Sequence, residues 1–480
     1  MDENHMEGTQ KLGFSALIAM VVGSMIGAGI FMLPRRFADA SGVYGTLVTW
    51  AVAGIGMLML AFVFQLLAIR KPTLNTGVFA YAKAGFGDYV GFIVAIGFWA
   101  SACAGNVTYL VLIKSTLGSF FPALGEGDSL LAIAISSVVI WLFFALILRG
   151  VKQAATINVI ATLAKLVPLV IFIVAIIVAF DPRVFSDNLM GVASSGNETL
   201  FSQVRQTMLI TVFVFLGIEG ASIYSRLAKK RKDVGKATVL GFLLVLALLV
   251  AVTLLSYGVL PRAEIAQLRQ PSLAGILESS VGSWGGLLIS FGLIISVLGA
   301  YLAWTLLSAE VLFAASEGND MPGFIKKTTS KGVPKNALLM SAILTQLILI
   351  VTYFSDGALD FALELTSALA LLPFFLTAVY SAKLILGKDR GLEAASQRRP
   401  FDYIVSILAT IYTAFLIYAA GWHYLLLSCL LLAPSSVLFF RARKEKGLRV
   451  FSTTEKIILA ILTIGAILAI VGLAVGWIVI

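Results

Sequence analysis

The sequence predicts an all-α integral membrane protein that crosses the bilayer many times. Of its 480 residues, 59% are hydrophobic and 12% are charged, whereas soluble globular proteins carry about a quarter charged residues. The mean hydropathy is +0.99. Apolar runs of about 20 residues, the length of a membrane-spanning helix, recur along the chain. A membrane β-barrel would instead show alternating segments of about 10 residues, so the spans are predicted to be helices.

The apolar runs define about 13 predicted spans. Only Gly421 and Trp422 separate the eleventh span from the twelfth, so the count is least defined there. The spans lie near residues 12–33, 44–67, 88–113, 129–148, 155–180, 206–226, 237–260, 283–314, 337–354, 359–386, 402–420, 423–440 and 455–479.

The residue content argues against several classes of function. Cys103 and Cys429 lie inside apolar runs, so neither a disulfide framework nor a thiolate metal site is expected. No loop is long enough for a nucleotide-binding domain, and the phosphate-binding motif G-x-x-x-x-G-K-[ST] does not occur. The chain has 2 histidines and shows no His/Asp/Glu cluster. We therefore expect no metal, no cofactor and no enzymatic activity.

The positive charge follows membrane topology. The net charge is +10, and most of the 35 lysines and arginines lie in the N-terminal tail and in alternate loops between spans. Because positive loops stay in the cytoplasm, the N-terminus is predicted to be cytoplasmic in a multi-pass protein of the plasma (inner) membrane. The acidic N-terminal tail lacks the basic region of a secretory signal. The lipid bilayer is the expected surrounding, and nucleic acid is not an expected partner.

The first span contains Gly23-Ser24-Met25-Ile26-Gly27-Ala28-Gly29-Ile30-Phe31 near its middle. Three glycines in seven positions disfavour a continuous helix. In hydrocarbon, a helix can open only where protein, water or a solute satisfies the freed main-chain groups, so a break would mark a cavity. Glycine also lets a ligand approach the main chain. The alternative is a small-residue face that packs against a neighbouring helix.

The sixth span repeats this pattern with a carboxylate. Phe215-Leu216-Gly217-Ile218-Glu219-Gly220-Ala221 places Glu219 between two glycines at mid-membrane. A charged side chain at that depth is costly and is commonly functional. Glu219 could alternatively be a structural group bonded to a neighbouring helix.

The two interrupted spans are five spans apart, as the first helices of two five-helix halves would be. An odd number of spans inverts the second half, and paired interruptions of this kind point to a midplane binding site in an inverted-repeat transporter. We therefore expect a transporter core over residues 1–400, with repeats near 12–180 and 206–386. Residues 401–480 are expected to add two or three peripheral C-terminal helices.

These two motifs resemble the first-helix and sixth-helix motifs of the amino acid/polyamine/organocation superfamily. The overall pattern is similar to its basic amino acid/polyamine antiporters, particularly the arginine/ornithine antiporters. The resemblance implies a substrate carboxylate held by main-chain N–H groups at Gly27, Ala28 and Gly29. Many arginine/agmatine exchangers have serine where this chain has Ala28. The substrate amino group would meet carbonyl groups near four further residues: Met25, Ile26, Phe213 and Leu216.

The resemblance also implies side-chain contacts. Trp304 matches an aromatic residue that covers the cationic end of the substrate; a desolvated contact of this kind contributes about 2 kcal/mol. Asn106 matches a recognition position, although it could equally form a bond between helices. Phe213 matches an aromatic gate, although a lone Phe in an apolar helix is commonly packing. Thr366 matches a polar contact in the tenth span. Glu364, beside it, is a further candidate carboxylate.

Lys165 lies ten residues into the fifth span, too deep for its ammonium to reach the membrane surface comfortably. In the superfamily, a lysine in the fifth helix resembles the group that replaces a sodium ion. We expect Lys165 to fill a cation site and to make transport sodium-independent. The alternative is a structural partner for a nearby carbonyl or carboxylate.

The sequence therefore predicts a secondary active transporter that exchanges cationic amino acids of the arginine/ornithine or lysine type by alternating access. Polyamines are related candidate substrates. A proton-coupled amino acid uptake permease is the alternative within transport. A passive channel is disfavoured by the paired breaks, and a membrane-embedded enzyme or receptor by the short loops. A homodimer is left open by the sequence.

Overall fold

The fold is built from membrane-length helices, as the apolar runs predict. A computed structural model describes residues 13–71, 73–74, 77–150, 154–190, 199–219, 231–318, 320–387 and 400–479, and every regular element in them is helical. Ten of these helices are long and apolar enough to cross a bilayer, and a bent pair over Leu17–Met25 and Ala28–Ala40 makes an eleventh. The all-α membrane class is thus confirmed.

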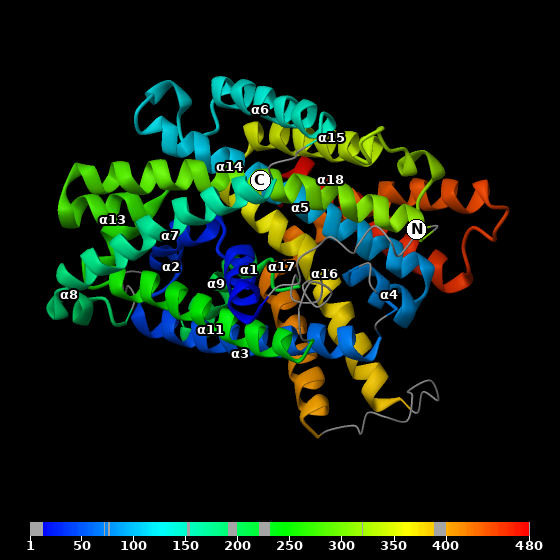
Figure 1. The fold of residues 1–480 in the computed structure, drawn as a ribbon, viewed down its shortest axis with the longest axis horizontal. Coiled ribbons are helices and arrows are strands. Elements are labelled where there is room, and N and C mark those ends of the chain that lie inside the picture. The colour runs from blue at the N-terminus through cyan, green and yellow to red at the C-terminus, as the bar shows by residue number, and fades with distance from the viewer. Residues whose placement is uncertain are drawn as a thin grey trace.

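The helices pack into one bundle, in which α1 lies near the centre of the view (Figure 1). The long elements are α3 (Val43–Arg70), α5 (Asp88–Gly118), α6 (Leu130–Leu148), α7 (Ala154–Val178), α9 (Leu200–Phe215), α11 (Arg231–Ser256), α14 (Ser283–Glu317), α15 (Lys335–Val351), α16 (Ala358–Leu386), α17 (Pro400–Glu445) and α18 (Thr453–Val475). The first span is α1 (Phe14–Met25), the 3₁₀ helix η2 (Ala28–Met32) and α2 (Leu33–Ala40).

These elements correspond in order to the predicted spans. Within α17, Gly421 has φ 73° and ψ 164°, so two helices meet there without an intervening loop. They correspond to the predicted spans 402–420 and 423–440. The part of the sixth span from Gly220 onward lies outside the described residues. The inverted relation of the two halves stays a prediction.

Short helices in the connections were not predicted. They are α4 (Val78–Phe86), η3 (Pro122–Leu124), α8 (Pro182–Asp187), α12 (Arg262–Gln267), α13 (Ser272–Val281), η5 (Gly323–Lys326) and η6 (Thr352–Phe354). Their segments are too short or too mixed in polarity to stand out from loops on hydropathy alone.

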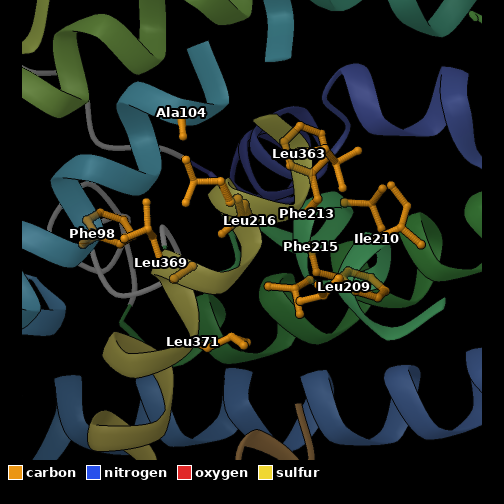
Figure 2. Close-up of a cluster of buried hydrophobic side chains, with 14 of the residues drawn as sticks. Phe98, Ala104, Leu209, Ile210, Phe213, Phe215, Leu216, Leu363, Leu369 and Leu371 are labelled. Carbon is orange, nitrogen blue, oxygen red and sulfur yellow. The ribbon is translucent and has the colours of Figure 1, made fainter. Parts of the chain in front are cut away.

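One part of the apolar core lies between α5, α9 and α16. Side chains of these three helices form one apolar cluster, in which Phe98 of α5 and Leu369 of α16 lie on one side and Phe215 of α9 on the other (Figure 2). Phe215 is fully buried. Apolar packing inside the bundle therefore holds the helices that surround the two predicted breaks.

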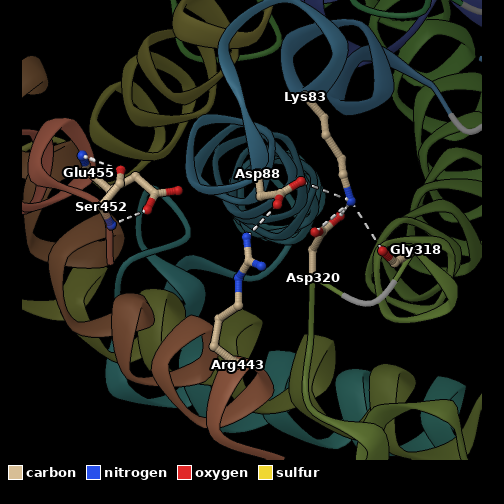
Figure 3. Close-up of polar contacts among 7 residues, drawn as sticks. All are labelled: Lys83, Asp88, Gly318, Asp320, Arg443, Ser452 and Glu455. Atoms are coloured by element: carbon tan, nitrogen blue, oxygen red, sulfur yellow. Dashed lines mark hydrogen bonds and ion pairs between the residues drawn. The ribbon is translucent and has the colours of Figure 1, made fainter. Parts of the chain in front are cut away.

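An ionic cluster joins the ends of four elements outside this core (Figure 3). Lys83 of α4 lies 2.7 Å from Asp320, which follows α14, and 3.5 Å from Asp88, the first residue of α5. Arg443 of α17 also pairs with Asp88. Burial raises the pKa of the Asp320 carboxyl, and the ammonium of Lys83 opposes that rise.

The last helix, α18, packs on α17 and begins with a capping box. The Ser452 hydroxyl accepts a hydrogen bond from the Glu455 N–H, and the Glu455 carboxylate accepts one from the Ser452 N–H (Figure 3). This reciprocal pair satisfies two main-chain donors that the first turn would otherwise leave unpaired.

Candidate functional site

The first span opens in the middle of Gly23–Phe31. Helix α1 ends at Met25, Ile26 is extended with ψ 91°, and Gly27 is extended with ψ −156°. The segments on the two sides are bent by 46°. The expected break is therefore present, and it lies between Met25 and Ala28.

The break leaves a small set of main-chain donors. The Gly27 N–H donates to the Met25 carbonyl oxygen at 2.9 Å. Ala28 and Gly29 begin η2, so their N–H groups have no acceptor within that helix. Of the three N–H groups that the family resemblance implies, those of Ala28 and Gly29 thus lack an acceptor within the helix in this conformation, and Gly29 also lines the cavity.

Lys165 binds the carbonyl groups at the end of α1. Its Nζ donates to the Gly23 carbonyl oxygen at 2.7 Å and to the Ile26 carbonyl oxygen at 2.6 Å. Lys165 lies on α7 and is 6% exposed. Because the helix stops at Met25, these carbonyl oxygens need donors from elsewhere, and the ammonium provides them.

The sixth span is also interrupted. Helix α9 ends at Phe215, and Leu216 leaves the helical conformation with ψ 135°. Gly217 has φ 106°, which L side chains rarely adopt. The Gly217 N–H lies 3.1 Å from both carboxylate oxygens of Glu219. Glu219 thus folds back onto the turn that the break creates.

The two breaks touch each other. The Ser24 hydroxyl donates to the Val21 carbonyl oxygen at 2.9 Å and lies 3.4 Å from the Gly217 carbonyl oxygen. A Cβ added to Gly217 would lie 2.5 Å from the Ser24 carbonyl oxygen. One added to Gly29 would lie 2.5 Å from Cγ1 of Val214. Glycine is thus required where the main chains of the two spans approach.

A cavity opens beside this contact, with about 360 Å³ of empty space that includes its open side. None of its lining residues carries a charge. They are Ser24, Met25, Gly27, Gly29, Ser101, Gly105, Tyr109, Phe213, Val214, Leu216, Trp304 and Thr366.

Most of the predicted site residues are brought together here. Those that line the cavity are Met25, Gly27, Gly29, Phe213, Leu216, Trp304 and Thr366. Those that lie behind or beside it without lining it are Ile26, Ala28, Asn106, Lys165 and Glu219. The first group comes from η2 with its preceding break, α9, α14 and α16, so four segments distant in sequence converge.

Two hydrogen bonds to main-chain carbonyl oxygens hold Thr366, the predicted polar contact of the tenth span, at the cavity. The Thr366 hydroxyl donates to the Ala362 carbonyl oxygen at 2.6 Å within α16. The Ser101 hydroxyl of α5 donates to the Thr366 carbonyl oxygen at 2.7 Å. This second bond fixes α16 against α5 at the cavity wall.

Asn106 forms a bond between helices. Its Nδ2 donates to the Thr305 hydroxyl of α14 at 3.2 Å. Its side-chain oxygen Oδ1 is buried without a hydrogen-bond partner in the described part of the chain. In this conformation the amide therefore joins α5 to α14.

The sequence analysis did not single out the side of α5 that faces the cavity. Ser101, Gly105 and Tyr109 all line the cavity. They are spaced by four residues, which places them on one face of a helix. That spacing was the available signal, and it distinguishes these residues from Asn106.

Glu364 belongs to an ion-pair cluster on the α2 side of the break. Arg36 of α2 lies 3.1 Å from Asp360 and 3.0 Å from Glu364, both on α16. On the same side, Arg262 of α12 donates to the carbonyl oxygens of Ala38 and Asp39. Helix α12 and this cluster together cover the α2 end of the site.

We predict that Gly217→Ala destabilises the protein more than Gly87→Ala does. Both glycines have φ near 100°, at 106° and 98°, and a Cβ there costs roughly 1–2 kcal/mol in either position. Only at Gly217 would the Cβ also meet main-chain atoms, at Ser24. Thermal unfolding in detergent should show the larger fall for Gly217→Ala. Equal melting temperatures for the two variants would contradict the contact between breaks.

Comparison with known proteins gives one consistent family. The amino acid permease family matches residues 12–467. The chain is 48% identical to an arginine/ornithine antiporter of Pseudomonas aeruginosa, over 98% of this chain and 99% of that protein. It is 37% identical to an L-lysine transport protein of Corynebacterium glutamicum, over 98% of this chain and 96% of that protein.

An arginine/ornithine antiporter of Lactococcus lactis is 37% identical, over 98% of this chain and 91% of that protein. These similarities run the length of the chain and include both interrupted spans. Together with the membrane-length helices, they make the chain a multi-pass membrane protein of transport type. It belongs to the amino acid permease family and, within the amino acid/polyamine/organocation superfamily, to the basic amino acid antiporters.

Proposed function

We propose that this protein exchanges cationic amino acids of the arginine/ornithine or lysine type across the plasma membrane by alternating access. The observation that carries this proposal is the uncharged cavity between two interrupted spans, with Trp304 in its wall. The antiporter relatives support the same substrate class. The chain is accordingly proposed as a transporter and not as an enzyme.

The proposed architecture has a core over residues 1–400 built from two inverted five-helix repeats, near 12–180 and 206–386. Residues 401–480 are proposed to be peripheral. We place the N-terminus in the cytoplasm on the basis of the loop charges. The α2 side of the break, with Arg36 and α12, would then face outward.

The proposed pose uses main-chain dipoles for the amino acid end. Ala28 and Gly29 would donate to the carboxylate, with Gly27 joining them if it releases Met25. Carbonyl oxygens of Met25 and of the second break, at Phe213 and Leu216, would accept from the ammonium. Such fixed groups favour a zwitterion without a charged side chain in the cavity.

Exchange itself is tested in proteoliposomes. Vesicles preloaded with ornithine should take up labelled arginine several times faster than empty vesicles, because the empty carrier would return with unpaired main-chain groups. Equal rates would contradict antiport. Uptake into empty vesicles that a proton gradient accelerates would instead support the proton-coupled permease.

Trp304→Ala is expected to weaken arginine binding roughly thirtyfold, because a desolvated cation–π contact contributes about 2 kcal/mol. The affinity for citrulline, a neutral analogue of arginine, should fall much less. Trp141→Ala is the control, since Trp141 is 40% exposed and lies outside the cavity lining. Isothermal titration measures both ligands. An unchanged preference for arginine over citrulline would remove Trp304 from recognition.

Lys165 is proposed to fill a cation site and to make exchange sodium-independent. Lys165→Met should lose most exchange activity, since it leaves the carbonyl oxygens of Gly23 and Ile26 without their donor. Lys114→Met is the matched control. Lys114 is 1% exposed, and its ammonium donates to the Leu110 carbonyl oxygen and the Ser136 hydroxyl, away from both breaks.

Exchange is measured with and without sodium and across pH. The control should keep the wild-type profile, whereas Lys165→Met should change it. If both variants keep that profile, Lys165 has a structural role only.

A further inference from the structure

We propose that the hydroxyl of Tyr109 is a substrate-binding group that donates a hydrogen bond to the carboxylate of the amino acid. This assignment rests on the proposed function, because it concerns the same cavity. It adds a specificity-determining side chain that neither the sequence motifs nor the relatives assign.

Tyr109 is held firmly at the cavity wall. It lies on α5, is 6% exposed and lines the cavity. Its ring meets that of Phe213 edge to face, with centroids 6.4 Å apart and planes at 68°. Phe213 itself projects from α9 into the apolar cluster (Figure 2). The contact with Phe213 restricts the ring, so binding would cost the hydroxyl little conformational entropy.

Tyr109 as a residue is buried, and its hydroxyl forms no hydrogen bond with the described residues; the hydroxyl oxygen is not fully enclosed, because it lies at the cavity. A hydroxyl that is free at a cavity wall can bond to a ligand without first giving up a partner in the protein. The Tyr257 hydroxyl, by contrast, donates to the Ser41 carbonyl oxygen at 2.8 Å. The Tyr412 hydroxyl is buried without a partner among the described residues, but it does not line the cavity. The Tyr109 hydroxyl is thus placed as a ligand-binding group would be.

The hydroxyl lies beside the first break. A Cβ added to Gly27 would be 3.5 Å from its oxygen, an ordinary van der Waals distance, so the hydroxyl lies close to the main chain of the break. The next two residues, Ala28 and Gly29, supply the N–H groups that η2 leaves without an acceptor. The tyrosine O–H and these N–H groups are therefore donors that converge on one region.

Convergent donors select an anionic oxygen and not an ammonium. On the other side of the break, Lys165 already bonds to the carbonyl oxygens of Gly23 and Ile26. That ammonium adds positive potential next to the donors. A carboxylate is the part of an amino acid that satisfies several donors together.

The test compares Tyr109→Phe with Tyr412→Phe in the full-length protein. Tyr412 is also 6% exposed, lies on α17 against Gly56 and does not line the cavity. Arginine binding is measured by titration, and agmatine and argininamide, which lack the carboxylate, are used as competitors. Tyr109→Phe should weaken arginine binding roughly tenfold, as expected for the loss of one hydrogen bond to a charged group. The affinity of Tyr109→Phe for both competitors should change less than about twofold. Tyr412→Phe should bind arginine and the competitors as wild type does.

The outcomes separate this inference from the proposed function. Wild-type protein that does not bind arginine would contradict the function itself. Wild-type binding with an unchanged Tyr109→Phe affinity would overturn the tyrosine assignment alone. An equal loss for arginine and agmatine would mean that the hydroxyl contacts the amino group or shapes the cavity, which also overturns it. If neither competitor binds wild type, the arginine affinity of Tyr109→Phe against Tyr412→Phe decides the question.

Discussion

The structure depends on a constraint of the bilayer: a main-chain carbonyl group inside it must have a donor. Helix α1 stops at Met25, and the carbonyl oxygens of Gly23 and Ile26 receive their hydrogen bonds from the Lys165 ammonium. One side chain of α7 thereby stabilises an opening that would otherwise be unfavourable. The opening in turn frees the N–H groups that begin η2 and gives the cavity its polar end.

The second consequence of that opening is the mutual contact of the two interrupted spans. Gly217 lies against the Ser24 main chain, and Gly29 lies against Val214. Packing and ligand access are alternative explanations of the glycines: the contacts of Gly29 and Gly217 agree with packing, and the ligand-access explanation stays a proposal. Gly29 and Gly217 allow the spans to approach, whereas Gly27 leaves space in the cavity wall. Small residues thus bring the breaks together and keep the main chain accessible.

The charged side chains near the cavity lie outside its lining. Its lining is uncharged, while ion pairs lie at its periphery, between Arg36 and α16 on one side and around Lys83 at the ends of α4 and α14. Partly exposed ion pairs contribute little to stability individually. In the proposed function, main-chain dipoles and Trp304 would recognise the substrate.

The sequence by itself determined the membrane class, the order of the spans and both interruptions, because hydropathy and glycine clusters are local properties of the chain. It also singled out Lys165, a charge within an apolar run. Only the tertiary structure decided which carbonyl oxygens Lys165 binds, that Asn106 bonds to Thr305, and that Tyr109 lies beside Gly27. The short helices α4, α8, α12 and α13 also emerged only there. Contacts between residues far apart in sequence depend on how whole helices pack, and a local pattern does not encode that packing.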